Sequence, residues 1–360
     1  MKKVTFPARG DFNKTLKARV DRYFAENRLN KTGDWRMFLK SALILAWLVT
    51  SYVLLVFFSG SLLMAILTVF ALAQGFVLVG FNIMHDGNHG SYSRNKTVNR
   101  LMGLTMDLIG GSSMLWRQKH NILHHTYTNV HELDDDLDTG GLIRLSPSQD
   151  WRPWHRFQHW YAFPLYSFLT LSWMTFSDFQ KIFTGRIGQY PLRKPSKREL
   201  FFFFLTKFFY FGYMLILPMF FHPVLYVLLG FLGVHIVLGF TLSIVFQLAH
   251  TVQGNAFPEP TEPTGVIENE WAIHQVETTA NFATKNKLVT WYLGGLNFQI
   301  EHHLFAKICH IHYPAISEIV QKTCREFSIP YMNHPTVRQA VVAHLRFLRD
   351  MSQPPQLVPA

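Results

Sequence analysis

Cysteine is scarce in this sequence of 360 residues, which contains only Cys309 and Cys324. Two thiols supply neither a disulfide framework nor a four-thiolate metal site. We therefore expect two buried or partly buried cysteines without a structural role in cross-linking. If the protein binds a metal, its ligands must come from other residue types.

Charged residues are also scarce, at 16% of the chain, whereas a soluble domain has about 25%. Residues 41–84 and 208–249 contain no Asp, Glu, Lys or Arg. A membrane crossing needs about 20 apolar residues, so each segment accommodates two crossings. Ser59-Gly60-Ser61 and His222-Pro223 mark the turns. The sequence predicts crossings at about 41–59, 62–83, 202–221 and 224–248.

Basic residues orient these crossings. Lys and Arg number eleven in residues 1–40, fourteen in 85–200 and eight in 250–360, and none lies in either hairpin turn. The positive-inside rule then places both termini and the central segment in the cytoplasm. The first apolar run starts near Ser41, so we expect no secretory signal peptide.

The predicted protein is therefore an all-α, multi-pass integral membrane protein with two helical hairpins and a cytoplasmic helical cap. We divide it into a cytoplasmic segment (1–40), a membrane domain (41–332) and a C-terminal helix with a loose Pro-rich tail (333–360). The apolar segments 101–116 and 157–177 are expected to lie in the interface or to dip into the membrane and return. The net charge of +11 favours contact with anionic lipid or an acidic protein partner. Nucleic acid is excluded, because the basic residues flank apolar spans.

Histidine is unusually frequent, with 18 residues. Eight of them follow predicted crossings in short clusters: His85, His89, His120, His124, His125, His250, His302 and His303. Histidines four residues apart project from one helix face, one turn apart, which suits chelation of one ion, as in His120 and His124. His125 points about 100° further round the helix, towards a second ion. Eight imidazoles exceed the needs of one ion and indicate two. Ligand type alone leaves iron, copper, nickel and zinc open.

The motifs HDGNH, HNILHH and QIEHH, with WAIHQVETTANF before the last, resemble the membrane fatty-acid desaturases. The likeness is greatest to the acyl-CoA and acyl-lipid desaturases whose third box begins with Gln, including the front-end group. This resemblance implies two iron ions held by all eight histidines, of which His250 matches an additional ligand outside the boxes. Gln299 stands where many relatives have a histidine ligand.

The resemblance also implies the reaction, in which O₂ and a reductant introduce a double bond into a long acyl chain carried on CoA or on a phospholipid. No fused haem domain is expected, because His222-Pro223 and His334-Pro335 are not followed by Gly-Gly. Electrons would then come from a separate carrier of the ferredoxin or cytochrome type.

Polar neighbours of the boxes are candidates for orienting the imidazoles. Asp86 follows a predicted ligand and Glu301 precedes two, and carboxylates orient a ligand by accepting its free ring N–H. His274, in WAIHQVETT, is a third candidate. The run Asp134-Asp135-Asp136 with Asp138 follows the second box and either serves in this way or caps a helix.

Two alternatives remain open. A hydroxylase or ketolase with the same type of metal site would add one oxygen instead of removing two hydrogens. A zinc-binding membrane protein would hold zinc and require neither O₂ nor a reductant. Product mass and metal analysis separate these functions.

Overall fold

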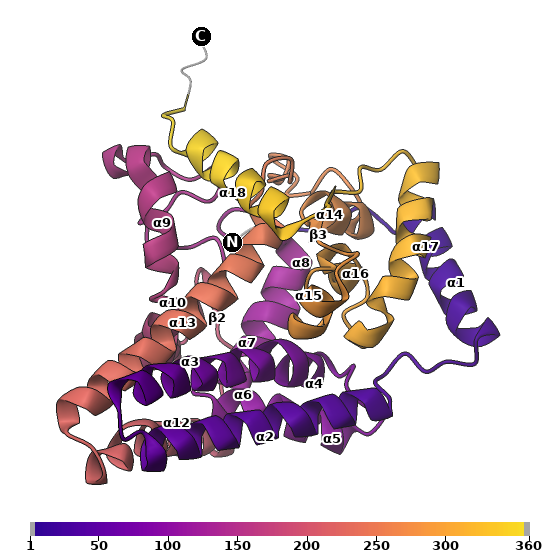
Figure 1. Cartoon of the computed structure of the whole chain (residues 1–360). Coiled ribbons are helices and arrows are strands. Elements are labelled where there is room, and N and C mark those ends of the chain that lie inside the picture. The colour runs from indigo at the N-terminus through magenta and orange to yellow at the C-terminus, as the bar shows by residue number, and fades with distance from the viewer. Residues whose placement is uncertain (1–3, 356–360) are drawn as a thin grey trace.

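The computed structural model describes residues 4–355, and its architecture is almost entirely helical (Figure 1). Four helices are long and apolar enough to cross a membrane, and we call them the spanning helices on this ground of length and composition: Trp35–Phe58, Leu62–His89, Lys197–Phe220 and Val224–His250. The shortest has 24 residues, which at about 1.5 Å per residue exceeds a hydrocarbon core of roughly 30 Å. The predicted all-α fold with four apolar helices is confirmed. The tail beyond residue 355 lies outside the described residues.

The first three of these helices begin at residues whose side chains cap them. α2 (Trp35–Phe58) starts at Asp34, whose carboxylate accepts a hydrogen bond from the backbone N–H of Arg36. The second helix joins α3 (Leu62–Val79), the π-helical η1 (Gly80–Met84) and α4 (His85–His89). The third contains α12 (Lys197–Phe211), η5 (Gly212–Ile216) and η6 (Pro218–Phe220), and the fourth is α13 (Val224–His250). The first and third helices therefore begin a few residues before the predicted boundaries, and the second continues through the first histidine box.

The other elements form a cap and its connections. They are α1 (Asp11–Glu26), α5 (Lys96–Gly103), α6 (Thr105–Leu108), α7 (Ser113–Trp116), η2 (Arg117–His124), α8 (His125–Tyr127), η3 (Pro153–Phe157), α9 (Gln158–Tyr166), α10 (Leu169–Ser172), η4 (Trp173–Ser177), α11 (Asp178–Thr184), α14 (Trp271–Glu277), α15 (Lys287–Tyr292), α16 (Gln299–Leu304), η7 (His310–His312), α17 (Tyr313–Glu326) and α18 (Val337–Met351). β1 (Arg186–Ile187) pairs antiparallel with β2 (Tyr190–Pro191), and β3 (Asn281–Phe282) pairs parallel with β4 (Asn333–His334).

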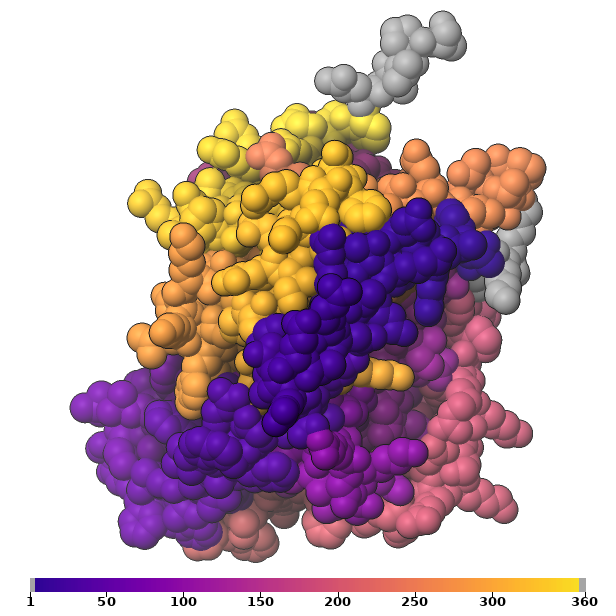
Figure 2. Space-filling model, turned by 90° about the vertical axis from the view of Figure 1, so that its right-hand side faces the viewer, coloured from indigo at the N-terminus to yellow at the C-terminus, as the bar shows by residue number. Residues whose placement is uncertain are grey.

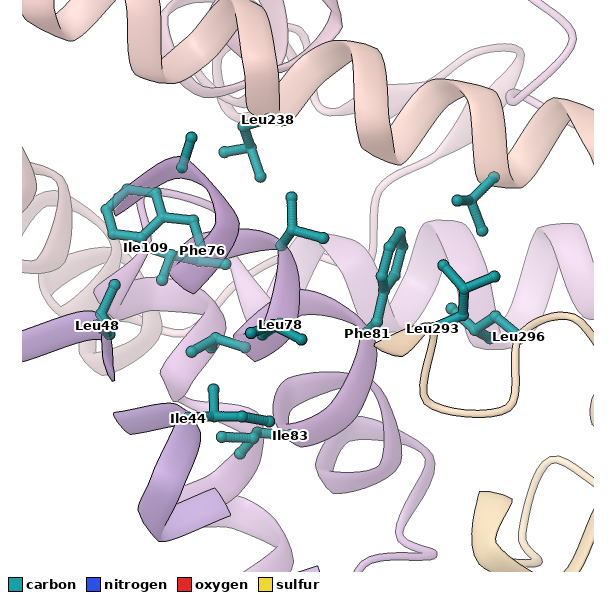
Figure 3. Packing of buried hydrophobic residues seen from close by; sticks show 14 of the residues in the cluster. Ile44, Leu48, Phe76, Leu78, Phe81, Ile83, Ile109, Leu238, Leu293 and Leu296 are labelled. Atoms are coloured by element: carbon teal, nitrogen blue, oxygen red, sulfur yellow. The ribbon is translucent and has the colours of Figure 1, made fainter. Parts of the chain in front are cut away.

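A continuous apolar core joins the spanning helices to the cap. Ile44 of α2, Phe76 of α3 and Leu238 of α13 are each at most 2% exposed and belong to one cluster (Figure 3). The same cluster contains Leu293 and Leu296, which follow α15 and lie near the end of α3 (Figure 3). Burial of such side chains stabilises the fold by about 1.5–3 kcal/mol each in water. The cap is thus packed onto the spanning helices instead of being tethered to them.

The N-terminal helix belongs to the cap. Its buried residues recur at helical spacing (Phe12, Leu16, Val20 and Phe24) and pack against α17 through a second apolar cluster. Figure 2 shows α1 lying across the C-terminal part of the chain. Residues 11–26 therefore cover part of the cap on this face.

The segment from α9 to α11 packs along α13. The hydroxyl of Thr170 lies 3.1 Å from Nδ1 of His235, which is in the middle of the fourth spanning helix. The segment ends beside the third spanning helix, where Lys207 Nζ donates to the Asp178 carboxylate at 2.8 Å. Lys207 also donates to the carbonyls of Gly110 and Met174, so its buried ammonium is fully paired. This arrangement explains how a spanning helix accommodates a lysine.

Candidate metal centre

The structure brings all eight predicted histidines together from four parts of the chain. α4, η2 with α8, the end of α13, and α16 each contribute. Their nitrogens form groups in which all donor atoms lie within 4.8 Å of one another: His85, His89, His120 and His302 in the first group, and His124, His250 and His303 in the second. His125 lies between the groups, close to His302 and His303. Two adjacent groups of nitrogen donors match the expected pair of ions.

The second box is π-helical, and this changes which of its histidines face one another. In η2 and α8 the closest pair is five residues apart, with 3.2 Å between Nε2 of His120 and Nε2 of His125. A π-turn brings residues i and i+5 onto one face. His120 therefore joins the first group and His124 the second, although both also lie near the carboxylate of Asp136. Chelation of one ion by His120 and His124 stays a prediction, because donor atoms of both also lie within 4.8 Å of each other and of an Asp136 carboxylate oxygen.

α16 supplies one imidazole to each group. The rings of the neighbouring His302 and His303 are nearly perpendicular, at 88°, with centroids 5.4 Å apart. His302 lies against His85, at 4.5 Å between ring centroids, and His303 lies 4.9 Å from His250. Adjacent positions on this helix thus serve two centres.

Each of these rings except that of His120 has at least one buried nitrogen with no hydrogen-bond partner among residues 4–355, and such nitrogens fit metal ions. Fully buried nitrogens without a hydrogen bond are Nδ1 of His85, Nε2 of His89, Nε2 of His124, Nδ1 of His125, both nitrogens of His250, Nε2 of His302 and Nε2 of His303. Each unpaired buried polar atom costs about 1–3 kcal/mol, so such a concentration needs a ligand. Metal coordination would satisfy these lone pairs together.

Burial also keeps these imidazoles neutral. In the cap, desolvation and then the neighbouring imidazoles lower the pKa of His120, His125, His302 and His303 well below the ordinary value. A neutral imidazole offers the lone pair that a metal requires. These four imidazoles are therefore ready to coordinate at neutral pH.

His124 differs because a carboxylate adjoins it. Burial opposes a proton on its ring, but the Asp134 carboxylate outweighs this effect and raises the pKa of His124. Nδ1 of His124 lies 3.0 Å from Oδ2 of Asp134, and the backbone N–H groups of Asn129 and Asp136 also donate to this carboxylate. A carboxylate held in this way fixes the ring orientation and makes Nε2 a stronger ligand.

Replacement of Asp134 by alanine is expected to lower metal affinity by about 10–100-fold, the usual effect of losing an orienting partner. Metal content after dialysis against graded chelator concentrations measures this change. Asp138→Ala is the matched control, because Asp138 is exposed and its carboxylate, among residues 4–355, accepts only from the backbone N–H of Gly140. Equal metal retention by the two variants would show that Asp134 does not orient His124.

Three uncharged residues hold the imidazoles of α16. Oε1 of Gln275 lies 2.8 Å from Nδ1 of His303, and the hydroxyl of Thr128 lies 3.2 Å from the same atom. The hydroxyl of Tyr313 lies 3.2 Å from Nδ1 of His302. In both histidines the opposite nitrogen, Nε2, remains free. These contacts aim each free nitrogen into the histidine cluster.

Asp86 is a predicted orienting residue, and its Oδ1 lies 3.7 Å from Nδ1 of His85. Its shorter hydrogen bonds are with other residues. Its carboxylate accepts hydrogen bonds from His310 Nδ1 at 2.9 Å and from the Cys309 thiol at 3.1 Å. Lys40 of α2 lies on the far side of this network, with Nζ 3.4 Å from Nε2 of His310. Asp86 thus connects the first box to the chain after the third box.

The other predicted residues are placed as follows. The Glu301 carboxylate accepts hydrogen bonds from Asn281 and Tyr331, and burial raises its pKa to about 7.

His274 is buried against the ring of Phe6, with 5.1 Å between ring centroids, and burial lowers its pKa to about 4. Oε1 of Gln299 is buried without a partner, one turn before His302. The orienting roles of Glu301 and His274 and ligation by Gln299 stay predictions.

Sequence reasoning missed the partners that lie outside the motifs. Gln275 directly follows His274, which was a candidate orienting residue, and this position was a usable signal for an orienting role of Gln275. His310 and Tyr313 carry no such signal, because only the fold brings the start of α17 and its preceding turn to α4 and α16. Their roles follow from contacts between distant segments.

Comparisons with known proteins agree with the site. The sequence profile of a family described as "Fatty acid desaturase" matches residues 60–335. The chain is 39% identical over 355 residues to the sn-1 linoleoyl-lipid 6-desaturase of Arthrospira platensis, which covers 98% of this chain and 96% of that protein. It is 36% identical to the sn-1 linoleoyl-lipid 6-desaturase of Synechocystis sp., covering 98% of each chain. It is 40% identical to the acyl-lipid (8-3)-desaturase of Physcomitrium patens, covering 95% of this chain and 72% of that one.

Proposed function

The chain belongs to the fatty acid desaturase family, and we propose that it introduces a carbon–carbon double bond into the acyl chain of a membrane lipid. Similarity over nearly the whole chain to proteins named as acyl-lipid desaturases supports this activity. The observation that carries it is the convergence of eight histidines with unpaired nitrogens, because oxidation of an unactivated chain needs a metal centre.

We propose that two iron ions occupy the two groups. His85, His89, His120 and His302 would hold one ion, and His124, His250 and His303 the other, with His125 between them and Gln299 as an additional candidate. Such a pair, when bound, supplies the O₂-dependent oxidation that the protein itself cannot perform. The imidazoles present unpaired nitrogens inward, and the partners behind them hold the rings in orientation.

The protein environment contributes orientation and exclusion of water. Six of the eight ligand candidates are buried, and those in the second group are each 1% exposed: His124, His250 and His303. Apolar residues of the spanning helices adjoin this site, so a hydrocarbon chain entering from the membrane would remain out of water. A dry site prevents loss of reactive species to solvent.

The overall reaction removes two hydrogens from adjacent carbons. One O₂, two protons and two electrons, together with these two hydrogens, yield two molecules of water. The electrons would come from a separate protein of the ferredoxin or cytochrome type, since neither His-Pro pair in the sequence is followed by Gly-Gly. We infer that this carrier docks on the cytoplasmic side, where the positive-inside rule places both termini and the histidine cluster.

Linoleoyl lipid is the substrate to test first, because the Arthrospira and Synechocystis relatives are named for it. Expression in a host that lacks further desaturation of linoleoyl lipids is expected to yield a product with one additional double bond. Mass spectrometry and mapping of double bonds in total lipid identify it. A product that has gained one oxygen would instead indicate a hydroxylase, and activity with stoichiometric zinc would contradict the iron proposal.

A further inference from the structure

A basic groove lies between α15 and the start of α18, away from the histidine cluster. It has a volume of about 640 Å³ and is lined by Ala283, Lys285, Asn286, Lys287, Leu288, Pro335, Thr336, Val337 and Arg338. This volume falls within the range of roughly 300–1,000 Å³ that is typical of small-molecule sites. The groove is therefore large enough for a lipid headgroup.

The charge of the groove is entirely positive. Lys285, Lys287 and Arg338 are exposed, and within residues 4–355 none of them forms an ion pair. The two stretches that meet here, residues 278–300 and 327–349, contain no Asp or Glu. The 15-residue helix α18 also begins at this groove, and a helix N-terminus carries partial positive charge. An anion is the ligand that these features complement.

The groove also lies at the level where the spanning helices meet the cap. Lys40 of α2 donates to the carbonyl of Trp291 in α15 and lies 4.9 Å from the centroid of its ring. Asn82 of the second spanning helix donates to the carbonyl of Tyr292 at 3.1 Å. Trp and Tyr side chains with nearby basic residues are typical of the membrane–water interface. α15 is thus held against the first two spanning helices.

The α18 side of the groove is anchored to the fourth spanning helix. Nδ1 of His344 lies 2.7 Å from the carbonyl of Thr251, which follows α13 directly. Ala340 of α18 belongs to the same apolar cluster as Phe76 and Leu238 of the spanning helices. The two walls of the groove therefore rest on different parts of the membrane-spanning bundle.

Apolar side chains accompany the cations. Leu288 and Val337, which line the groove, are 82% and 38% exposed. An acidic soluble protein would gain little from these side chains at the bilayer surface. A ligand with an anionic head and hydrocarbon chains would use both features.

We propose that this groove binds the anionic headgroup of a membrane phospholipid, with the lipid chains against Leu288 and Val337. Arg338 suits a phosphate because its planar guanidinium donates two parallel hydrogen bonds. This site goes beyond the desaturase reaction, since lipid retention does not depend on turnover.

Lipid retention by the purified full-length protein tests the proposal. The protein is held in a mild detergent with phosphatidylglycerol or phosphatidylcholine, and native mass spectrometry counts the lipids that remain bound. We expect the wild type to prefer phosphatidylglycerol, and the triple variant Lys285→Gln, Lys287→Gln, Arg338→Gln to lose at least about tenfold in affinity for it. Metal content and unfolding temperature confirm that this variant is folded.

The matched control removes three cations elsewhere on the cap: Lys17→Gln and Arg22→Gln on α1 and Lys322→Gln on α17, all exposed in the structure. It is expected to retain phosphatidylglycerol like the wild type. Inorganic phosphate at the lipid concentration is expected not to displace the lipid.

Three results would overturn the proposal. They are equal retention of the two lipids by the wild type, undiminished phosphatidylglycerol binding by the triple variant, and displacement of the lipid by free phosphate. If the triple variant keeps the lipid but loses an acidic ferredoxin or cytochrome, the groove docks a protein. None of these measurements requires desaturase activity, so the proposed reaction stands or fails separately.

Discussion

Replacement of His303 by alanine is expected to abolish desaturation while the protein still inserts into the membrane. His303 contributes to the second histidine group with His124 and His250, and it also lies beside His125. Its Nδ1 is held by Gln275, so that the unpaired Nε2 points into the cluster. Loss of an orienting partner alone costs about 10–100-fold, and loss of the ligand itself is expected to cost more.

Metal analysis with a matched control variant separates this loss from misfolding. Metal analysis of the purified variant is expected to show less bound iron than in the wild type, and His124→Ala should have the same effect. His222→Ala is the matched control, because His222 lies at the other end of the bundle and its Nε2 is 2.8 Å from the carbonyl of Val56. Activity that survives His303→Ala would count against the assigned ligand set.

Replacement of Gly294 by alanine is expected to destabilise the junction between the third box and the second spanning helix. Gly294 has φ = +58°, and an added Cβ would lie 2.3 Å from the carbonyl oxygen of Phe81. That oxygen belongs to the backbone of buried η1, so neither partner moves aside easily. Left-handed backbone costs roughly 1–2 kcal/mol in a residue with a Cβ, and overpacking adds about 1–3 kcal/mol.

The displacement would reach the metal centre, because α16 begins five residues later and carries His302 and His303. We expect a lower unfolding temperature in detergent and a parallel loss of bound metal. Two controls isolate the causes. Gly185→Ala places a Cβ at φ = +65° with no atom within 4 Å, and Gly212→Ala adds one in a helix with the same free space. An unfolding temperature for Gly294→Ala equal to that of Gly185→Ala would disprove the backbone contact.

The spanning helices were predictable because their signal is local. A run of residues without charge is visible along the chain, and a helix rises by a constant amount per residue. The boundaries were less predictable, since charged side chains at the ends of these helices find partners in the fold. Lys40 reaches the carbonyl of Trp291, and Lys207 inside the third helix is neutralised by Asp178.

The candidate ligands were also predictable, because histidines at short spacing beside apolar spans need a chemical reason. Their grouping was not. The π-helical turns of η2 bring His125 to face His120. The residue types in HNILHH do not indicate that this segment is π-helical instead of α-helical. The partners of the imidazoles were largely hidden as well, since Gln275 and Tyr313 reach them only through packing of the cap.

The sequence by itself determined the helical class, the number of long apolar helices and histidine as the candidate metal ligand. All three depend on composition and spacing within short windows. Only the tertiary structure decided which imidazoles form each group, which side chains orient them, and that Lys285, Lys287 and Arg338 share one groove. These properties arise from contacts between segments far apart in the chain, and such contacts are set by packing of the whole molecule.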